Sequence, residues 1–313
     1  MTEQALVQIR NLSKTIGNKR IIKNLNLDLY KGQITGFLGP NGAGKTTTIR
    51  MMVGLMRPTE GEVWIDGQSV QTDFEDSIQK VGVIVENPEM YKYMSGYKNL
   101  LHFSRMHKGV SKERIDEVVK QVGMQNRINE KVASYSLGMR QRLGLAQALL
   151  HDPKFLILDE PTNGLDPAGI REFRIYLQKI AKENGVAIFV SSHLLSEIEL
   201  LCDRIAIIQN GELIDIKNVH DLQKSRFYIQ AEPLELAEEV LTGIGFPPVL
   251  HDKGYLIDSG AEHIPGVINL LVGAGVRIFA VQPYRETLES QFLEMTGGGE
   301  IPLSVLSKQN RVR

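Results

Sequence analysis

The segment Gly-Pro-Asn-Gly-Ala-Gly-Lys-Thr at residues 39–46 constrains the structure of this chain more than any other part of it. It matches the phosphate-binding pattern G-x-x-x-x-G-K-[ST], in which successive backbone N–H groups of a Gly-rich loop point toward phosphate oxygens. Residues 33–38 before it have the apolar character of a buried strand, and residues 47–56 after it have the spacing of an amphipathic helix. Strand, loop and helix in this order predict a site for a nucleoside triphosphate.

The residue types of this loop predict how it would hold the phosphates. We expect contacts from the whole loop and from the residue after it: Gly39, Pro40, Asn41, Gly42, Ala43, Gly44, Lys45, Thr46 and Thr47. Lys45 can reach the β- and γ-phosphates, and the hydroxyl of Thr46 can ligate Mg²⁺. A helix that begins near Gly44 adds the positive end of its dipole to the same site.

Two acidic residues, Asp159 and Glu160, follow an apolar run at residues 155–158. A carboxylate at the end of a buried strand can hold Mg²⁺ and its water shell, which is the role we expect of Asp159. Glu160 would point the other way and polarise a water for in-line attack on the γ-phosphate. The simpler interpretation, an acidic helix cap before Pro161, is disfavoured by the phosphate-binding loop in the same chain.

Composition excludes several classes of protein. The net charge is −1, so a nucleic-acid-binding surface is not expected. The single cysteine, Cys202, excludes an internal disulfide and fits a reducing compartment. No apolar run approaches the ~20 residues that cross a bilayer, and the polar N-terminus has no signal-peptide core. We therefore expect a soluble, cytoplasmic protein that reaches a membrane only through a partner.

The order of apolar and polar segments predicts an α/β fold with two domains. Nearly continuous apolar strands separated by helices indicate a parallel sheet covered on both faces, preceded by antiparallel strands at the N-terminus. We expect a nucleotide-binding domain over residues 1–220, with an inserted helical subdomain at about 87–150. Signals in the order βαββαβ predict a small α+β accessory domain over 226–296, and residues 297–313 have the composition of a flexible tail.

Three further segments complete a family pattern. Residues 135–142 read Tyr-Ser-Leu-Gly-Met-Arg-Gln-Arg, residues 160–166 read Glu-Pro-Thr-Asn-Gly-Leu-Asp, and His193 follows two serines. With the phosphate-binding loop and Asp159, they make residues 5–216 resemble the ATP-binding subunits of ABC transporters. The resemblance implies a P-loop NTPase core of the ABC ATPase type, with ATP and Mg²⁺ as cofactors and ATP hydrolysis as the activity.

The resemblance also implies how the remaining site residues act. Segment 135–142 is similar to the family signature, which in a head-to-tail dimer faces the γ-phosphate bound by the other subunit. This assigns Ser136, Gly138 and Met139 to nucleotide contacts made in trans, and Ser136 is also a good N-cap for the following helix. His193 matches the family's switch histidine, which hydrogen-bonds the γ-phosphate or the attacking water. The expected assembly is a homodimer beneath a separate transmembrane permease, peripheral on the inner face of the membrane.

The chain departs from the family pattern at three places. Glu86 stands where the family has a glutamine beside Mg²⁺, so we assign Glu86 to the metal and to the attacking water. The signature has Leu137 and Met139 in place of a glycine and a glutamine. Ile16 replaces the aromatic residue that stacks on adenine, which leaves its effect on base selectivity open. The first two departures are similar to the bacitracin-resistance and lantibiotic-immunity branch, which consists of exporters.

The leading hypothesis is an ATPase subunit of an exporter of a peptide antibiotic or similar compound, and two alternatives stay open. One is a soluble ABC ATPase that acts on the ribosome or on DNA; a single cassette without a long coiled coil argues against it. The other is a sensor that binds ATP without turnover, against which the presence of Glu160 argues. Residues 87–104 include Tyr91, Tyr93 and Met94, which fit either a groove for a permease helix or the core of the helical subdomain.

Overall fold

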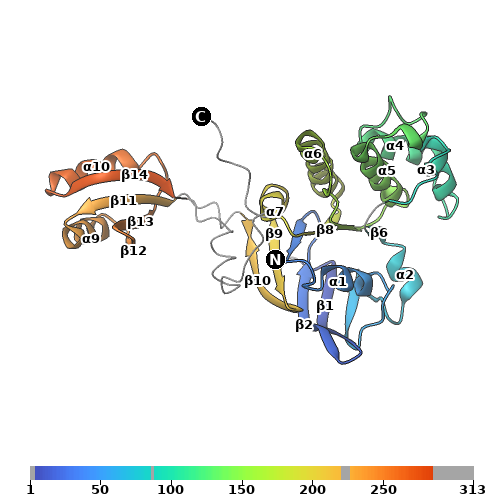
Figure 1. The fold of residues 1–313 in the computed structure, drawn as a ribbon, viewed down its shortest axis with the longest axis horizontal. Helices are drawn as coiled ribbons and strands as arrows, with labels where there is room; N and C mark the ends of the chain where they lie inside the picture. The colour runs from blue at the N-terminus through green and yellow to red at the C-terminus, as the bar shows by residue number, and fades with distance from the viewer. Residues whose placement is uncertain (1–3, 86–87, 220–225, 285–313) are drawn as a thin grey trace. The chain divides into compact units, whose positions relative to one another are not determined.

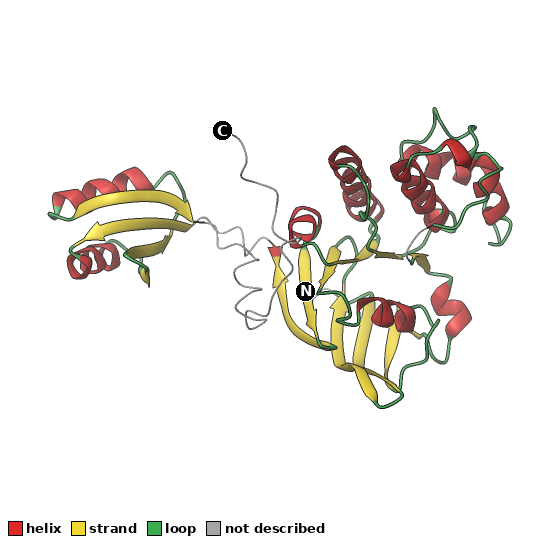
Figure 2. Ribbon diagram, viewed as in Figure 1, coloured by secondary structure: helices red, strands yellow, loops and turns green. Residues whose placement is uncertain are grey.

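The computed structural model describes residues 4–85, 88–219 and 226–284. These residues form two compact units that divide between Lys217 and Asn218. Both units contain helices and strands, as Figures 1 and 2 show. The first unit carries all the predicted site residues that the structure describes.

An antiparallel sheet opens the first unit, as the sequence predicts. Its strands are β1 (Val7–Ile16), β2 (Lys19–Leu29), β4 (Glu60–Ile65) and β5 (Gln68–Ser69). They lie in the order β2-β1-β4-β5, and Val7 of β1 is opposite Leu29 on one side and Ile65 on the other. The turn between β1 and β2 begins at Gly17, whose φ of 56° lies in the left-handed region that glycine adopts without strain.

A six-stranded sheet forms the centre of the first unit. Its strands are β3 (Ile34–Leu38), β6 (Val81–Ile84), β7 (Phe155–Asp159), β8 (Ala187–Ser192), β9 (Arg204–Gln209) and β10 (Glu212–Asn218). The order is β10-β9-β3-β8-β7-β6, with parallel pairing from β9 through to β6. Every residue of β3, β7 and β8 is buried, which agrees with the predicted sheet covered on both faces.

Helices and the antiparallel sheet cover the two faces of this central sheet (Figure 1). The helices outside the helical subdomain are α1 (Lys45–Met52), α2 (Phe74–Ile78), α6 (Pro167–Asn184) and α7 (Leu195–Leu201). Helix α1 shares a core with the antiparallel sheet, whereas α7 packs against Gly36 on the opposite face. The predicted end of α1 at Met56 is wrong by one turn, because Gly54 turns the chain with a φ of 71°.

A group of helices lies between β6 and β7 in the chain, in the region predicted as a helical subdomain (Figure 1). It consists of α3 (Gly96–Ser104), α4 (Lys112–Gln121), the 3-10 helix η1 (Val132–Ser134) and α5 (Leu137–Leu149). The hydroxyls of Ser95, Ser111 and Ser136 cap α3, α4 and α5, each accepting a hydrogen bond from the backbone N–H three residues on. The predicted cap of the signature helix is therefore confirmed.

The two sheets of the first unit share one hydrophobic core. Ile22 of β2 packs in one buried cluster with Phe155 of β7 and Ile49 of α1. Phe37 and Phe189, on neighbouring strands of the central sheet, have ring centroids 5.1 Å apart. Burial of side chains of this size contributes about 1.5–3 kcal/mol each. The loop between β3 and α1 is thereby anchored at both ends by buried elements.

The second unit has an α+β fold with its own core. Its elements are β11 (Arg226–Glu232), α9 (Leu234–Gly243), β12 (Val249–His251), β13 (Gly254–Asp258), α10 (Ile264–Gly273) and β14 (Arg277–Tyr284). All pairs in the sheet order β12-β13-β11-β14 are antiparallel, and Ile229, Leu241 and Leu271 are fully buried. The predicted fold class, a P-loop core with a small C-terminal α+β domain, is confirmed. The predicted end of that domain at 296 and the predicted tail lie outside the described residues.

Candidate active site

Three neighbouring strands end at one edge of the central sheet, and polar residues follow each of them. Leu38 at the end of β3 is opposite Ser192 at the end of β8, and Asp159 at the end of β7 is opposite Ser191. This pairing brings together the residues that follow the three strands: Gly39, Glu160 and His193. The edge is therefore built from three segments that are far apart in the sequence.

Backbone conformation prepares the loop between β3 and α1 to bind an anion. Gly44 is the N-cap of α1 with a φ of 109°, and no side chain caps this helix end. A Cβ at Gly44 would lie 2.4 Å from Cδ1 of Ile22, so both the conformation and the space require glycine. The first N–H groups of α1 are thus directed at the loop, where a phosphate would meet them together with the helix dipole.

Lys45 carries a buried positive charge into this loop. Its side chain is 7% exposed, and Nζ donates to the carbonyl oxygen of Gly39 at 2.7 Å. Nζ also lies 3.3 Å from Oε1 of Glu160, which balances the buried charge. These contacts hold the ammonium group beside the loop backbone, where it could contact a bound phosphate.

Thr46 and Asp159 bring a hydroxyl and a carboxylate together beside the loop. Oγ1 of Thr46 donates to Oδ2 of Asp159 at 2.9 Å, and the hydroxyl of Ser191 donates to the other carboxylate oxygen. Asp159 is 3% exposed, so these hydrogen bonds hold both of its oxygens in a fixed orientation. Oxygen donors of this kind suit Mg²⁺, and the pair therefore fits the predicted metal site.

Glu160 lies between a cation and an imidazole. Its Oε2 is 2.8 Å from Nδ1 of His193, and its Oε1 faces the Lys45 ammonium group. The backbone of Glu160 has a φ of 49°, a left-handed conformation that is uncommon outside glycine. Its N–H donates to the carbonyl oxygen of Ser191 at 3.2 Å and to the Ser191 hydroxyl at 3.0 Å. These contacts hold the carboxylate beside the phosphate-binding loop, a position that is compatible with the predicted role of a general base.

A cleft of about 310 Å³ joins these groups. Its lining combines most of the predicted phosphate-binding residues with Glu160 and His193: Asn41, Gly42, Gly44, Lys45, Thr46, Thr47, Glu160 and His193. The cleft is also lined by Ile21 and Asn163, which the sequence analysis did not identify. Ile21 lies on β2 and reaches the cleft through tertiary packing, so no local motif could indicate it. Ile16 does not line the cleft and is 50% exposed at the end of β1.

The chain is similar to ABC transporter proteins over nearly its whole length. The sequence profile of the family described as ABC transporter matches residues 22–163. YhcH, an ABC transporter ATP-binding protein of Bacillus subtilis (strain 168), is 54% identical over 297 residues, which cover 94% of this chain and 97% of the relative. The chain belongs to the family of ABC transporter ATP-binding proteins. It is an ABC ATPase, which binds ATP and couples its hydrolysis to transport, as the sequence predicts.

Other similar proteins include transport ATPases for peptide antibiotics. BcrA of Bacillus licheniformis, a bacitracin transport ATP-binding protein, is 38% identical and covers 95% of this chain and 99% of its own. SrtF of Streptococcus pyogenes, a lantibiotic transport ATP-binding protein, is 41% identical but covers 67% of this chain and 89% of its own. A solved dimeric ATP-binding cassette in a post-hydrolysis state with ADP and Pi is 25% identical, with a TM-score of 0.60 over 68% of this chain and 98% of that one. ABC ATPases pair with a permease and dimerise.

The ABC signature of this chain lies outside the nucleotide cleft. Ser136, Gly138 and Met139 are absent from the cleft lining. Ser136 is exposed at the start of α5, and its hydroxyl accepts a hydrogen bond from the backbone N–H of Met139 at 3.2 Å. The side chain of Met139 is 9% exposed and packs in the interior, so the exposed part of the signature is the helix end at Ser136.

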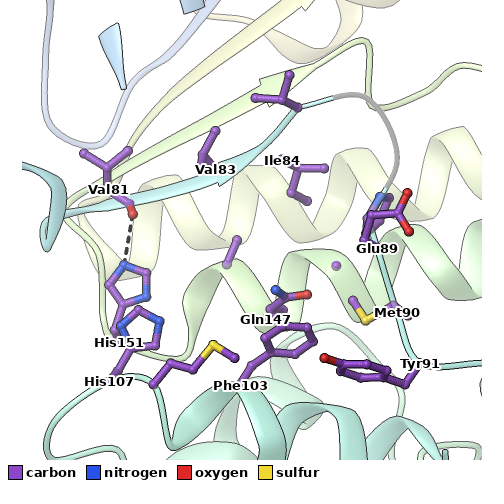
Figure 3. Close-up of a pocket in the computed structure, with 15 residues that line it drawn as sticks. Val81, Val83, Ile84, Glu89, Met90, Tyr91, Phe103, His107, Gln147 and His151 are labelled. Carbon is purple, nitrogen blue, oxygen red and sulfur yellow. Dashed lines mark hydrogen bonds between the residues drawn. The ribbon is translucent and has the colours of Figure 1, made fainter. Parts of the chain in front are cut away.

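A groove of about 720 Å³ lies between β6 and the helical subdomain of this ABC ATPase (Figure 3). Its lining is mainly apolar and aromatic, and Met106 is 64% exposed. The buried Asn99 fixes the groove wall, because its amide accepts from the N–H of Tyr91 at 2.8 Å and donates to the carbonyl oxygen at 3.1 Å. Tyr91 lines the groove and is 38% exposed, which favours a groove over a subdomain core for this residue, whereas Tyr93 is 69% exposed and is not part of the groove lining.

Two histidines stack at one end of the groove, as Figure 3 shows. The rings of His107 and His151 have centroids 4.4 Å apart, and Nε2 of His151 lies 3.0 Å from the carbonyl oxygen of Val81. Burial lowers the pKa of His151, and the neighbouring His107 lowers it further. The lowered pKa favours the neutral imidazole of His151 at this end of the groove.

Glu86 lies outside the described residues, so its predicted place beside the metal remains a prediction. In the described part of the chain, no helix is long and apolar enough to cross a membrane.

Proposed function

We propose that this chain is the ATPase subunit of an exporter of a peptide antibiotic or a similar compound. The observation that carries the proposal is the similarity to the bacitracin transport ATPase, which extends over both units. The lantibiotic transport relative covers a smaller part of the chain, so the bacitracin-type branch is the better match. This choice of branch concerns the class of cargo and leaves the individual compound undetermined.

The contacts of the cleft support a role for each residue in hydrolysis. Lys45 is held where the β- and γ-phosphates of ATP would lie, and its charge would stabilise the negative charge that spreads over the γ-phosphoryl group. ATP binding would draw Lys45 toward phosphate oxygens and free the Glu160 carboxylate to orient a water for in-line attack. His193 would orient the same carboxylate and hydrogen-bond the γ-phosphate.

Mg²⁺ is the cofactor that the oxygen donors of this site fit. Thr46 and Asp159 would hold it, with Glu86 as a further predicted ligand, and the bound ion would neutralise charge on the β- and γ-phosphate oxygens. The protein's own contribution is the orientation of Asp159, which Ser191 and Thr46 fix through hydrogen bonds.

The exposed signature supports an ATP-dependent homodimer. Ser136, Gly138 and the start of α5 are outside the cleft of their own subunit, so a contact with a γ-phosphate needs a second copy. The N-terminus of α5 offers N–H groups and a helix dipole to that phosphate. Hydrolysis would remove the shared γ-phosphate and allow the two copies to separate.

The groove beside the helical subdomain is the proposed docking site for the permease. Its exposed aromatic and Met side chains suit an amphipathic helix on the cytoplasmic side of a transmembrane subunit. Such docking would hold the chain at the inner face of the cell membrane as a peripheral protein. With the permease docked in this groove, the closing and opening of the dimer would move the permease.

Antibiotic sensitivity tests this function. Deletion of the chain from its source strain should lower the inhibitory concentration of cyclic or lanthionine peptide antibiotics, and not that of unrelated antibiotics. The wild-type chain should restore resistance, whereas Lys45→Ala, which loses the phosphate-binding ammonium group, should not. Unchanged sensitivity to every peptide antibiotic, or full rescue by Lys45→Ala, would contradict the proposal.

A further inference from the structure

The segment that leaves the active site after Glu160 is fixed to the helix that follows His193. The hydroxyl of Thr162 donates a hydrogen bond to Oε2 of Glu197 on α7. Thr162 is 9% exposed, and Glu197 lies one helical turn after His193. One side-chain contact therefore connects the two segments that carry the groups facing the γ-phosphate.

Glu197 makes this contact from a half-buried position in largely apolar surroundings. Its side chain lines a cavity of about 630 Å³ between α6 and α7 that is largely apolar. Burial raises the pKa of Glu197, the hydrogen bond from Thr162 lowers it, and the negative charge of Glu160 raises it again. A half-buried carboxyl group without hydrogen-bond donors is unfavourable, and the side chains of Thr162 and Ser192 supply such donors to Glu197.

The backbone at Glu160 explains why such an anchor is needed. Its φ of 49° is a conformation that non-glycine residues keep only when the surrounding structure enforces it. The N–H of Glu160 is held by Ser191, and the turn after it is closed by a hydrogen bond from the N–H of Leu165 to the carbonyl oxygen of Thr162 at 3.1 Å. The side chain of Thr162 is the point at which this turn is tied to α7.

We propose that Glu197 is a positioning residue for ATP hydrolysis, which through Thr162 fixes the segment that carries Glu160 relative to the helix that follows His193. The inference rests on the proposed role of Glu160 as the base. Glu197 does not line the nucleotide cleft, so it acts through the geometry of the two segments. Loss of the contact lets Glu160 move relative to the γ-phosphate, and such small displacements lower the rate of chemistry more than they weaken substrate binding.

The rest of the segment stays anchored when this contact is removed. The carboxylate of Asp166 caps α6 by accepting from the N–H of Gly169 at 3.0 Å. Gly164 approaches Leu137 of α5 so closely that a Cβ there would lie 2.9 Å from a Leu137 methyl group. Thr162→Val, which keeps the shape of the side chain, should therefore leave the fold intact.

The test compares steady-state hydrolysis by purified full-length variants. Thr162→Val and Glu197→Ala should each lower kcat about tenfold while the KM for ATP stays within about twofold. The double variant should be no worse than either single variant, because both remove the same contact. Thr162→Ser keeps the donor and Glu197→Gln keeps an acceptor, so both should retain most of the wild-type kcat. Ser196→Ala, on the exposed residue next to Glu197, is the matched control and should hydrolyse ATP at the wild-type rate.

Three results overturn the inference, two of them in the rates alone. One is a wild-type kcat in Thr162→Val; the other is a double variant whose loss is the product of the two single losses. A kcat that falls in parallel with the melting temperature, and recovers on cooling, would assign the contact to stability alone and also overturn it. Glu160→Gln separates this outcome from failure of the site itself: if Glu160→Gln is inactive and Thr162→Val is fully active, only the role of Glu197 is wrong.

Discussion

At the residue scale, the site depends on charged side chains that are buried but paired. Lys45 and Asp159 are 7% and 3% exposed, and each has hydrogen-bond partners supplied by other strands or by the loop itself. Without these partners a buried charge would be strongly destabilising. The side chains of the proposed phosphate-binding site are thus part of the folded core.

We expect turnover to depend most on the carboxylate of Glu160. Glu160→Gln keeps the size of the side chain and its contact with His193 but removes the base, so ATP hydrolysis should fall at least about a hundredfold. ATP affinity should be retained, because the phosphate contacts of the loop are unchanged. Phosphate release and nucleotide titration on the same preparation check both statements. Turnover close to wild type would remove Glu160 from its role.

Sequence alone identified the candidate site residues that belong to short sequence motifs. The phosphate-binding loop, Asp159, Glu160 and His193 each belong to a short motif, and the structure brings them to one sheet edge. Ile21 lines the cleft without a motif of its own, because its place is decided by how β2 packs. Asn163 also lines the cleft and lies in the family segment 160–166, but that segment did not indicate a role for it. The sequence did not predict contacts between side chains that are distant in the chain, such as that of Thr162 with Glu197.

At the element scale, the sequence located the strands and helices but not all of their ends. Ser136 was a correct N-cap because a serine before an apolar-periodic run is a local signal. The end of α1 was misplaced by one turn, since the apolar spacing continues past the point where Gly54 turns the chain. The groove beside β6 depends on the packing of α3 and α5 near β6, which periodicity does not describe.

An ion cluster at Asp66 connects the antiparallel sheet to the central sheet. Its carboxylate lies 2.7 Å from Nζ of Lys154 and 3.0 Å from Nζ of Lys80, which precede β7 and β6. Hydrogen bonds from Lys154 and then from Lys80 hold the pKa of Asp66 below its usual value. These contacts therefore stabilise the fold at pH values above the ordinary aspartate pKa, and the stabilisation is lost as the pH falls through the lowered pKa of the folded state.

Asp66→Asn tests this connection through the pH dependence of unfolding. The variant should be less stable than wild type above about pH 4, and the difference should shrink as both proteins are acidified below that value. Urea unfolding followed by fluorescence of the single tryptophan, Trp64 on β4, reports on the first unit. Asp116→Asn on the exposed side of α4 is the control and should match wild type at every pH. A deficit in Asp66→Asn that does not change with pH would contradict the account.

At the scale of the whole molecule, the proposed mechanism needs two copies of the chain. The first unit has its candidate nucleotide cleft at the edge of the central sheet, whereas the signature helix end at Ser136 is exposed and does not line that cleft. The second unit has a separate core, and the similarity to the bacitracin transport ATPase includes it. Two copies of the first unit would complete both sites, which neither copy can do alone.

The mass of the Glu160→Gln variant in solution tests this central claim most directly. With Mg-ATP, sedimentation should give a dimer, and with ADP a monomer, because only the triphosphate reaches the signature of the second copy. Ser136→Asp in the same background keeps a good helix cap but sets a negative charge against the γ-phosphate, so it should remain monomeric with ATP. A monomer of Glu160→Gln at saturating Mg-ATP, or a dimer that is indifferent to Ser136→Asp, would contradict the account.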